Sequence, residues 1–350
     1  MALLKFKKVG IAGMSACVPK NTIKNEHFTE IFSEESLKKA IKTTGIIERR
    51  IADKDKCSSD YCYEAADELL DEMKIDRNSI DLLIFVSQTP DYRIPSTAII
   101  LQDRLGLPKS TAAFDINLGC SGYVYGLSVA FAYSSQESIN KVLLLVGDTV
   151  SKFVSPKDKT TSLLFGDGGT ATLIEKNSKF GDSYFSLNSD GGRSDVLKIK
   201  AGGYRNPSSH ETLTPKIHEA GNIRSDEQLF MDGAEIFNFT IQEVPKDIKK
   251  LLKYSNTEMK NIDFIVYHQA NKFITDYLTK KMKCSLDKVP YSLDKYGNTS
   301  CASIPLTIVS KLREKSTNKR IILCGFGVGL SWATALIDFS DVCIYKIREL

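Results

Sequence analysis

The sequence lacks the features that mark several large classes of protein. No apolar run approaches the ~18 residues that a membrane-spanning helix needs. Lysines interrupt the first apolar stretch, so that stretch does not resemble a secretion signal. Lys and Arg total 47 against 43 Asp and Glu, and the resulting net charge of +4 is far below the basic excess of nucleic-acid-binding proteins. We therefore expect a cytoplasmic protein that binds neither membranes nor nucleic acids.

Cysteine and histidine are scarce as well. Eight cysteines are too few for a disulfide scaffold in 350 residues, none forms a Cys-x-x-Cys pair, and there are only four histidines. The glycine-rich stretches lack the Gly-Lys-Ser/Thr of a phosphate-binding loop and the Gly-x-Gly-x-x-Gly spacing of a dinucleotide site. These absences predict reduced thiols, no metal site and no bound cofactor.

What the sequence does contain is an alternation of strand-like and helix-like segments, which predicts an α/β architecture. Two continuous apolar segments, 81–87 and 262–267, are typical of strands buried on both faces. Each of them follows a predicted helix and ends in polar residues, so the two regions have the same order of elements. The predicted strands are 5–16, 81–87, 112–118, 141–147, 171–174, 262–267, 320–324 and 331–339, and the predicted helices are 58–74, 96–105, 119–134, 233–253, 272–282 and 301–313.

The internal similarity suggests a duplicated α/β unit. We expect an N-terminal half over 1–180, a polar, glycine-rich connection of short strands and loop over 181–230, and a C-terminal half over 231–350. Such a duplication places the strand ends of both halves at one crevice, which is where open α/β sheets bind ligands.

Cys120 is the first candidate for chemistry. It follows a predicted buried strand and lies in the first turn of a predicted helix, between Gly119 and Ser121-Gly122. Unpaired N–H groups and the helix dipole at that place favour a thiolate over a thiol. The alternative is that Cys120 is a small apolar side chain filling the core, as most buried cysteines are.

His268 and Asn298 are its candidate partners. His268 ends the most apolar strand of the C-terminal half, where an imidazole could donate or accept a proton. Asn298 lies in the segment Tyr296-Gly-Asn-Thr-Ser-Cys-Ala302, which by itself is ordinary turn and helix-capping sequence. Each of the two could equally be a structural residue. They become candidates for catalysis because they occur together with Cys120.

Six segments in order resemble the beta-ketoacyl-acyl carrier protein synthase III family of the thiolase superfamily. They are 115–122, 165–168, 231–237, 268–271, 297–300 and 325–332. The resemblance implies a thiolase-like, five-layered αβαβα fold of two similar halves, a homodimer, and a catalytic triad of Cys120, His268 and Asn298.

The resemblance also implies a reaction. An acyl thioester acylates Cys120, with the backbone N–H groups of Cys120 and Val328 around the developing oxyanion. A malonyl thioester on acyl carrier protein then loses CO2 while His268 and Asn298 donate to its carbonyl oxygen, and the carbanion attacks the acyl-cysteine. The implied substrate-pocket residues are Phe326, Met231, Phe237 and, closing the partner subunit's pocket, Ile94.

Departures from the family pattern fall on substrate binding. Lys39, Thr43 and Lys159 stand where members that use CoA primers place a tryptophan and two arginines. Lysine cannot stack on an adenine ring as arginine does, so the acyl carrier could be CoA or acyl carrier protein. Basic residues expected to meet an acidic carrier protein are Lys272, Lys280 and Lys281.

Two other functions stay open at this point. The acyl group of Cys120 could pass to an amine or an alcohol instead of a malonyl carbanion, or the chain could be a non-catalytic partner subunit. The intact Cys120, His268 and Asn298 argue against the second of these. The sequence does not give the acyl chain length or the pathway.

Overall fold

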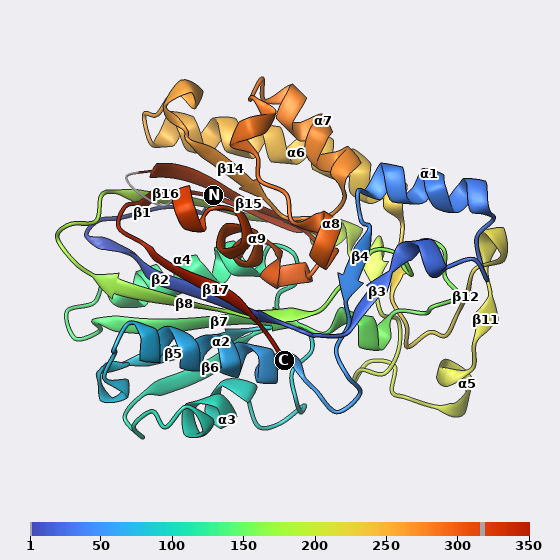
Figure 1. Ribbon diagram of the computed structural model, residues 1–350, viewed down its shortest axis with the longest axis horizontal. Helices are drawn as coiled ribbons and strands as arrows, with labels where there is room; N and C mark the ends of the chain where they lie inside the picture. Colours follow the sequence, from blue (N-terminus) through green and yellow to red (C-terminus); the bar gives the residue numbers. More distant parts are fainter. Residues whose placement is uncertain (1, 316–318) are drawn as a thin grey trace.

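Two β-sheets lie one above the other, with helices between them and on both outer faces (Figure 1). The computed structural model describes residues 2–315 and 319–350. The larger sheet has six strands in the order β17-β2-β8-β7-β5-β6. Its strands are β2 (Val9–Val18), β5 (Leu82–Val86), β6 (Ala112–Ile116), β7 (Lys141–Asp148), β8 (Gly168–Lys176) and β17 (Cys343–Glu349).

The second sheet has five strands in the order β1-β9-β16-β15-β14. β14 and β15 are parallel, and the remaining pairs are antiparallel. Its strands are β1 (Ala2–Phe6), β9 (Ser183–Ser189), β14 (Phe264–Tyr267), β15 (Lys319–Gly327) and β16 (Ser331–Phe339).

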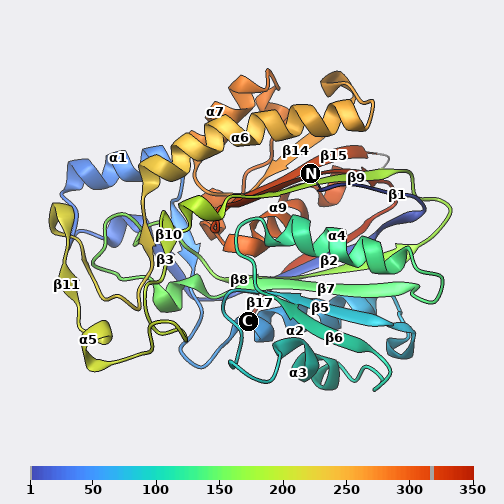
Figure 2. The same ribbon diagram turned by 180° about the vertical axis from the view of Figure 1, so that it is seen from behind.

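The large helices form three layers around these sheets. α2 (Ser58–Glu72) and α3 (Thr97–Arg104) cover the outer face of the six-stranded sheet, and α6 (Gly233–Tyr254) and α7 (Lys272–Lys281) lie over the five-stranded sheet (Figures 1 and 2). α4 (Gly122–Ser134) and α9 (Ser303–Lys311) lie between the sheets. The order helix, sheet, helix, sheet, helix confirms the predicted five-layered αβαβα fold.

The composition of α4 follows from its place in the middle layer. It contacts β7 on one side and β15 and β16 on the other, and nine of its thirteen residues are buried. A helix covered on both sides has to be apolar around most of its circumference. α6, which has one face in solvent, instead buries a single apolar stripe that includes Ile236, Phe239, Ile248 and Leu251.

The smaller elements complete one end of the molecule. α1, α5, β3 and β11 lie at the right end of Figure 1 and the left end of Figure 2, beyond the ends of the two sheets. These elements are α1 (Glu34–Thr44), α5 (His210–Leu213), α8 (Leu293–Tyr296) and the strand pairs β3 (Thr22–Lys24) with β4 (Glu48–Arg50), β10 (Leu197–Lys198) with β13 (Phe230–Met231), and β11 (Lys216–Ile217) with β12 (Ile223–Arg224).

The strands differ from the sequence prediction at three places in the chain. The predicted strand 5–16 is two strands, because Lys8 takes a positive φ of 61° and turns the chain from β1 into β2. β9, inside the segment predicted as a connection, is a full member of the five-stranded sheet. β17 was not predicted, because it is a half-exposed edge strand without a continuous apolar run.

Sheet membership also cuts across the two predicted halves. β1 lies in the sheet that contains β14 to β16, and β17 lies in the sheet that contains β2 and β5. The division into 1–180, 181–230 and 231–350 therefore stays a prediction about the two similar halves, and the sheets themselves follow other boundaries.

Candidate active site

Cys120 lies in the turn between β6 and α4, two residues before the helix begins, and is 7% exposed. Glycines keep the space around it open. A Cβ atom at Gly327 would lie 2.7 Å from the Cys120 sulfur, and one at Gly119 would lie 2.2 Å from Oε1 of Gln88. Larger residues at these two positions would therefore displace the sulfur or the strand end beside it.

His268 follows the last residue of β14 and is held from two sides. Its backbone N–H donates to the carbonyl of Cys324 at 2.7 Å, and its Nδ1 lies 2.7 Å from Oγ of Ser303 in α9. The ring of Phe326 meets the imidazole edge-on, with 5.5 Å between the ring centroids. Burial lowers the pKa of His268 to about 3, so the imidazole is neutral at neutral pH.

Asn298 is held by its backbone and by its side chain. Its N–H donates to Leu164 and its carbonyl accepts from Gly166, at 2.9 and 3.1 Å. Its side-chain Oδ1 accepts from the backbone N–H of Ser300 at 2.9 Å. Because the carboxamide oxygen is already bonded within the turn, the group that Asn298 offers to a ligand is the NH2 donor.

These three residues line one cavity of about 60 Å³. The structure therefore brings together the three side chains that the sequence nominated from three separate segments. The rest of the wall is mostly apolar: Leu164, Phe165, Leu197, Met231, Gly233, Ile236, Ala270, Asn271, Ile274, Phe326 and Gly327. Leu164, Leu197, Ile236 and Ile274 were not predicted, because nothing in the sequence distinguishes them from other core residues.

The resting state of Cys120 differs from the sequence prediction. Burial raises the pKa of its thiol to about 11, although hydrogen bonds from the backbone N–H groups of Val328 and Cys120 oppose that shift. The residue stands two positions before the first residue of α4. The direction of the two shifts favours a thiol at Cys120 and a neutral imidazole at His268 in the same cavity at neutral pH.

The loop that carries Val328 joins β15 to β16 and is fixed by two serines. Ser331 Oγ donates to the carbonyl of Val328 at 2.7 Å and lies 2.7 Å from Oγ of Ser121. These bonds tie the loop to the residue that follows Cys120. The N–H groups of Val328 and Cys120 both act on the sulfur, so the two predicted oxyanion donors lie at one place.

Only two of the four predicted pocket residues line this cavity. Met231 and Phe326 line the cavity, but Phe237 is not among its lining residues. The ring of Phe237 instead stacks on Phe273 at 5.3 Å, between α6 and α7. Ile94 is 83% exposed and also lies outside the cavity of its own chain.

The predicted docking lysines all stand on α7 and are exposed. Lys272 pairs with Asp276 at 2.5 Å, and Lys281 donates to the carbonyl of Ile241 at 2.8 Å. The residues at the altered CoA positions, Lys39, Thr43 and Lys159, are exposed as well.

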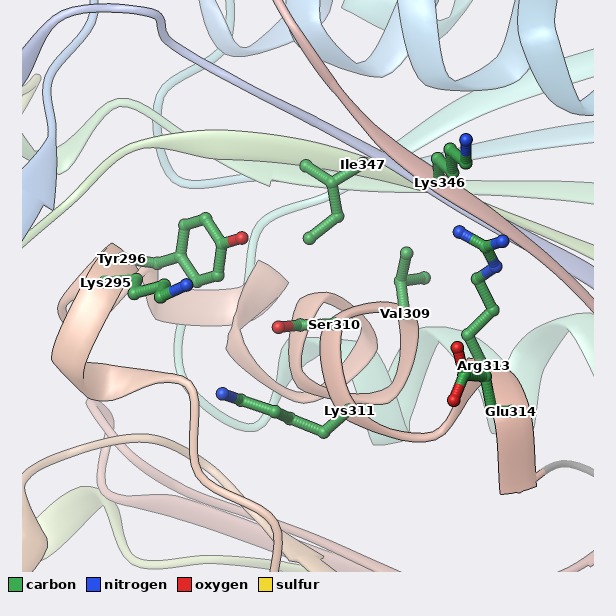
Figure 3. Close-up of a pocket in the computed structure, with 9 residues that line it drawn as sticks. All are labelled: Lys295, Tyr296, Val309, Ser310, Lys311, Arg313, Glu314, Lys346 and Ile347. Atoms are coloured by element: carbon green, nitrogen blue, oxygen red, sulfur yellow. The ribbon is translucent and has the colours of Figure 1, made fainter.

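A larger pocket lies away from these residues. It has a volume of about 540 Å³ and is lined from α8, α9, β17 and the turn after α9 (Figure 3). Its lining residues are Lys295, Tyr296, Val309, Ser310, Lys311, Arg313, Glu314, Lys346 and Ile347, and the triad is not among them. Within residues 2–315 and 319–350 there is no group of three or more Cys, His, Asp or Glu side chains placed to hold a metal ion. None of the helices in that part of the chain is long and apolar enough to cross a membrane.

Known proteins resemble this chain in sequence over nearly its full length. The family model for 3-oxoacyl-[acyl-carrier-protein] synthase III matches residues 114–191, and the model for the C-terminal part of that enzyme matches residues 252–339. The putative 3-oxoacyl-[acyl-carrier-protein] synthase 3 of Campylobacter jejuni is 39% identical over 342 residues, which cover 97% of this chain and 96% of that protein. The beta-ketoacyl-[acyl-carrier-protein] synthase III of Clostridioides difficile is 35% identical over 337 residues, 95% of this chain and 99% of that protein.

The fold agrees with these relatives. The crystal structure of a 3-oxoacyl-(acyl-carrier protein) synthase from Burkholderia xenovorans superposes with a TM-score of 0.93 at 40% sequence identity, covering 100% of this chain and 99% of that chain. Sequence similarity and fold thus lead to the same conclusion: this chain belongs to the beta-ketoacyl-[acyl-carrier-protein] synthase III family.

Proposed function

We propose that this protein condenses an acyl group with a malonyl thioester, releases CO2 and forms a 3-oxoacyl thioester. The observation that carries the proposal is the meeting of Cys120, His268 and Asn298 at one buried, mostly apolar cavity. A nucleophilic sulfur and two neutral hydrogen-bond donors in such a cavity suit chemistry that passes through an enolate.

Acylation uses the Cys120 side of the cavity. The sulfur attacks the carbonyl carbon of the acyl thioester, and the backbone N–H groups of Cys120 and Val328 stabilise the oxyanion that forms. The bond from that carbon to the carrier's sulfur then breaks. The proton of the Cys120 thiol ends on the departing carrier thiolate, so no charge is left in the cavity.

Condensation uses the other two residues. The malonyl thioester binds with its carbonyl oxygen facing the Asn298 NH2 group and the Nε2 of His268, since Nδ1 is occupied by Ser303. The bond to the carboxylate breaks, CO2 leaves, and the electron pair forms an enolate that both donors stabilise. The enolate carbon attacks the acyl carbonyl, the bond to the Cys120 sulfur breaks, and the departing thiolate takes a proton from water.

The proposal also covers the carriers that bring the malonyl and acyl groups. Acyl carrier protein brings the malonyl group and docks against α7 through Lys272, Lys280 and Lys281, all of which are exposed. Lys39, Thr43 and Lys159 leave the carrier of the acyl donor open between CoA and acyl carrier protein.

We include a homodimer and a cytoplasmic location in the proposal. β6 is the last strand of the six-stranded sheet, with one edge free in the described part of the chain. The exposed apolar residues Ile94 and Ile99, which are 83% and 50% exposed, lie in the segment just before it. In a dimer built along this edge, Ile94 would close the pocket of the partner subunit.

The test is intact-protein mass spectrometry with a panel of acyl-CoA and acyl-carrier thioesters, followed by malonyl-carrier and measurement of CO2. The wild-type protein should gain one acyl mass, and Cys120→Ala should gain none. Cys343→Ala, which alters an exposed cysteine, is the control and should be acylated like the wild type. Acylation followed by transfer to an amine or alcohol without CO2 would favour the alternative acyltransferase, and no acylation at all would reject both.

A further inference from the structure

A buried carboxylate lies behind the catalytic cavity without lining it. Asp148 ends β7 and is 0% exposed. Its Oδ1 accepts from the backbone N–H of Gln88 at 2.7 Å and from Oγ of Ser87 at 3.0 Å. Its Oδ2 accepts from Sγ of Cys301 at 3.1 Å. The carboxylate therefore joins the end of β5 to a turn more than two hundred residues later in the chain.

That turn is the one that orients Asn298. The backbone N–H of Ser300 holds Oδ1 of Asn298, and the side chain of Ser300 also hydrogen-bonds to Asp148. Ser300 has a positive φ of 51°. A residue with a Cβ atom keeps such a backbone conformation only where surrounding contacts hold it. The bonds from Asp148 to Ser300 and Cys301 are contacts of this kind.

On its other side, Asp148 is hydrogen-bonded to Gln88, which lies next to the turn that carries Cys120. Gln88, whose N–H binds Asp148, places its side chain directly against Gly119, the residue before Cys120. Asp148 thus lies between the segment that carries Cys120 and the turn that carries Asn298.

The hydrogen-bond donors around Asp148 match the acceptor sites of a carboxylate. Every group bonded to Asp148 is a donor, and no ion pair involves Asp148 within the described residues. Burial raises the pKa of Asp148, while the hydrogen bonds from its neighbours act against that shift. An ionised carboxylate has only acceptor sites, whereas an asparagine of the same shape would turn an NH2 group toward one set of donors.

From this geometry we propose that Asp148 is a positioning residue: by holding Ser300 and Cys301 it fixes the direction of the Asn298 NH2 group, and it thereby sets the rate of malonyl decarboxylation. The inference rests on the proposed function for its kinetic part. Its structural part, the ordering of the Asn298 turn, does not depend on which substrate the enzyme uses.

The test compares Asp148→Asn with a matched control. Asp247→Asn replaces another buried carboxylate, which accepts from Ser186 and Thr334 at 2.6 and 2.7 Å on the far side of the five-stranded sheet. We expect Asp148→Asn to acylate Cys120 within about twofold of the wild-type rate and to release CO2 from malonyl-carrier about 10- to 100-fold more slowly. Asp247→Asn should keep the wild-type ratio of the two rates.

Two further measurements separate positioning from general damage. In a double-mutant cycle, Asp148→Asn should slow decarboxylation much less in the Asn298→Ala background than in the wild type, because the amide that Asp148 positions is then gone and only the bond between the Ser300 backbone and His268 is left to disturb. Hydrogen–deuterium exchange should show faster exchange of the peptide covering 297–303 in Asp148→Asn and unchanged exchange there in Asp247→Asn.

The outcomes are distinguishable. A wild-type protein that releases no CO2 rejects the proposed function, and the exchange measurement still decides whether Asp148 orders the turn. Equal losses of acylation and decarboxylation, additive effects in the cycle, or unchanged exchange of 297–303 would each overturn the role given to Asp148.

Discussion

The protonation state of Cys120 gives the sharpest prediction, because two physical effects oppose each other there. The start of a helix favours the thiolate, but burial raises the pKa of Cys120 to about 11. If burial dominates, only about one enzyme molecule in 10⁴ holds a free thiolate at pH 7. Raising the pH to 9 should then increase the thiolate fraction about 100-fold.

Alkylation by iodoacetamide measures this fraction, because the thiolate is the form that reacts. The rate at Cys120 should rise about tenfold for each pH unit from 7 to 10 without a plateau. Intact-protein mass spectrometry follows the reaction, and Cys120→Ala gives the contribution of the other seven cysteines. A plateau reached below pH 8 would show that the helix start and the N–H groups dominate, and the argument from burial would be wrong.

Three further predictions concern the rest of the site. His268→Ala and Asn298→Ala should each keep acylation and lose decarboxylation about 100-fold or more, measured as acyl mass and as CO2; loss of acylation alone would reverse their roles. Because burial lowers the pKa of His268 from 6.5 to about 3, its neutral form stabilises the fold above pH 6.5, and that contribution disappears as the pH falls toward 3. Urea unfolding at pH 7 and pH 4 should therefore show a smaller acid loss for His268→Gln than for wild type, and equal losses would contradict the shift. Gly327→Ala places a Cβ atom 2.7 Å from the Cys120 sulfur, at a backbone φ of +156° that a residue with a Cβ atom rarely adopts. The variant should acylate more than about tenfold more slowly and should also melt at a lower temperature; normal acylation would show that the loop can move aside.

The sequence was informative where chemistry and position coincide. Cys120 and His268 each follow a strand that the apolar pattern makes visible, and Asn298 stands in a motif that has meaning only with the other two. The alternation of elements indicated an α/β architecture, and the family resemblance implied the five layers. These features depend on local pattern and on order along the chain, both of which a sequence records directly.

The remaining features depend on packing. Leu197 and Ile274 line the cavity because of where β10 and α7 meet it, and no local pattern marks them. Phe237 was assigned to the pocket, yet its ring lies against Phe273. The pKa of Cys120 depends on how much protein surrounds the sulfur, a quantity that the helix-start argument leaves out.

The two outer strands β1 and β17 each belong to the sheet of the other half, and this affects how the protein folds during synthesis. β17 pairs with β2, more than three hundred residues earlier in the chain, and β1 can pair only after β9, nearly two hundred residues later, has been made. Neither sheet can be finished before its late strands, β17 in one and β14 to β16 in the other, have left the ribosome. A chain without β17 would leave an open edge on a sheet whose other strands all lie within the first 180 residues. The two halves therefore mature together, and the crevice between them forms only after β14 to β17 have been made.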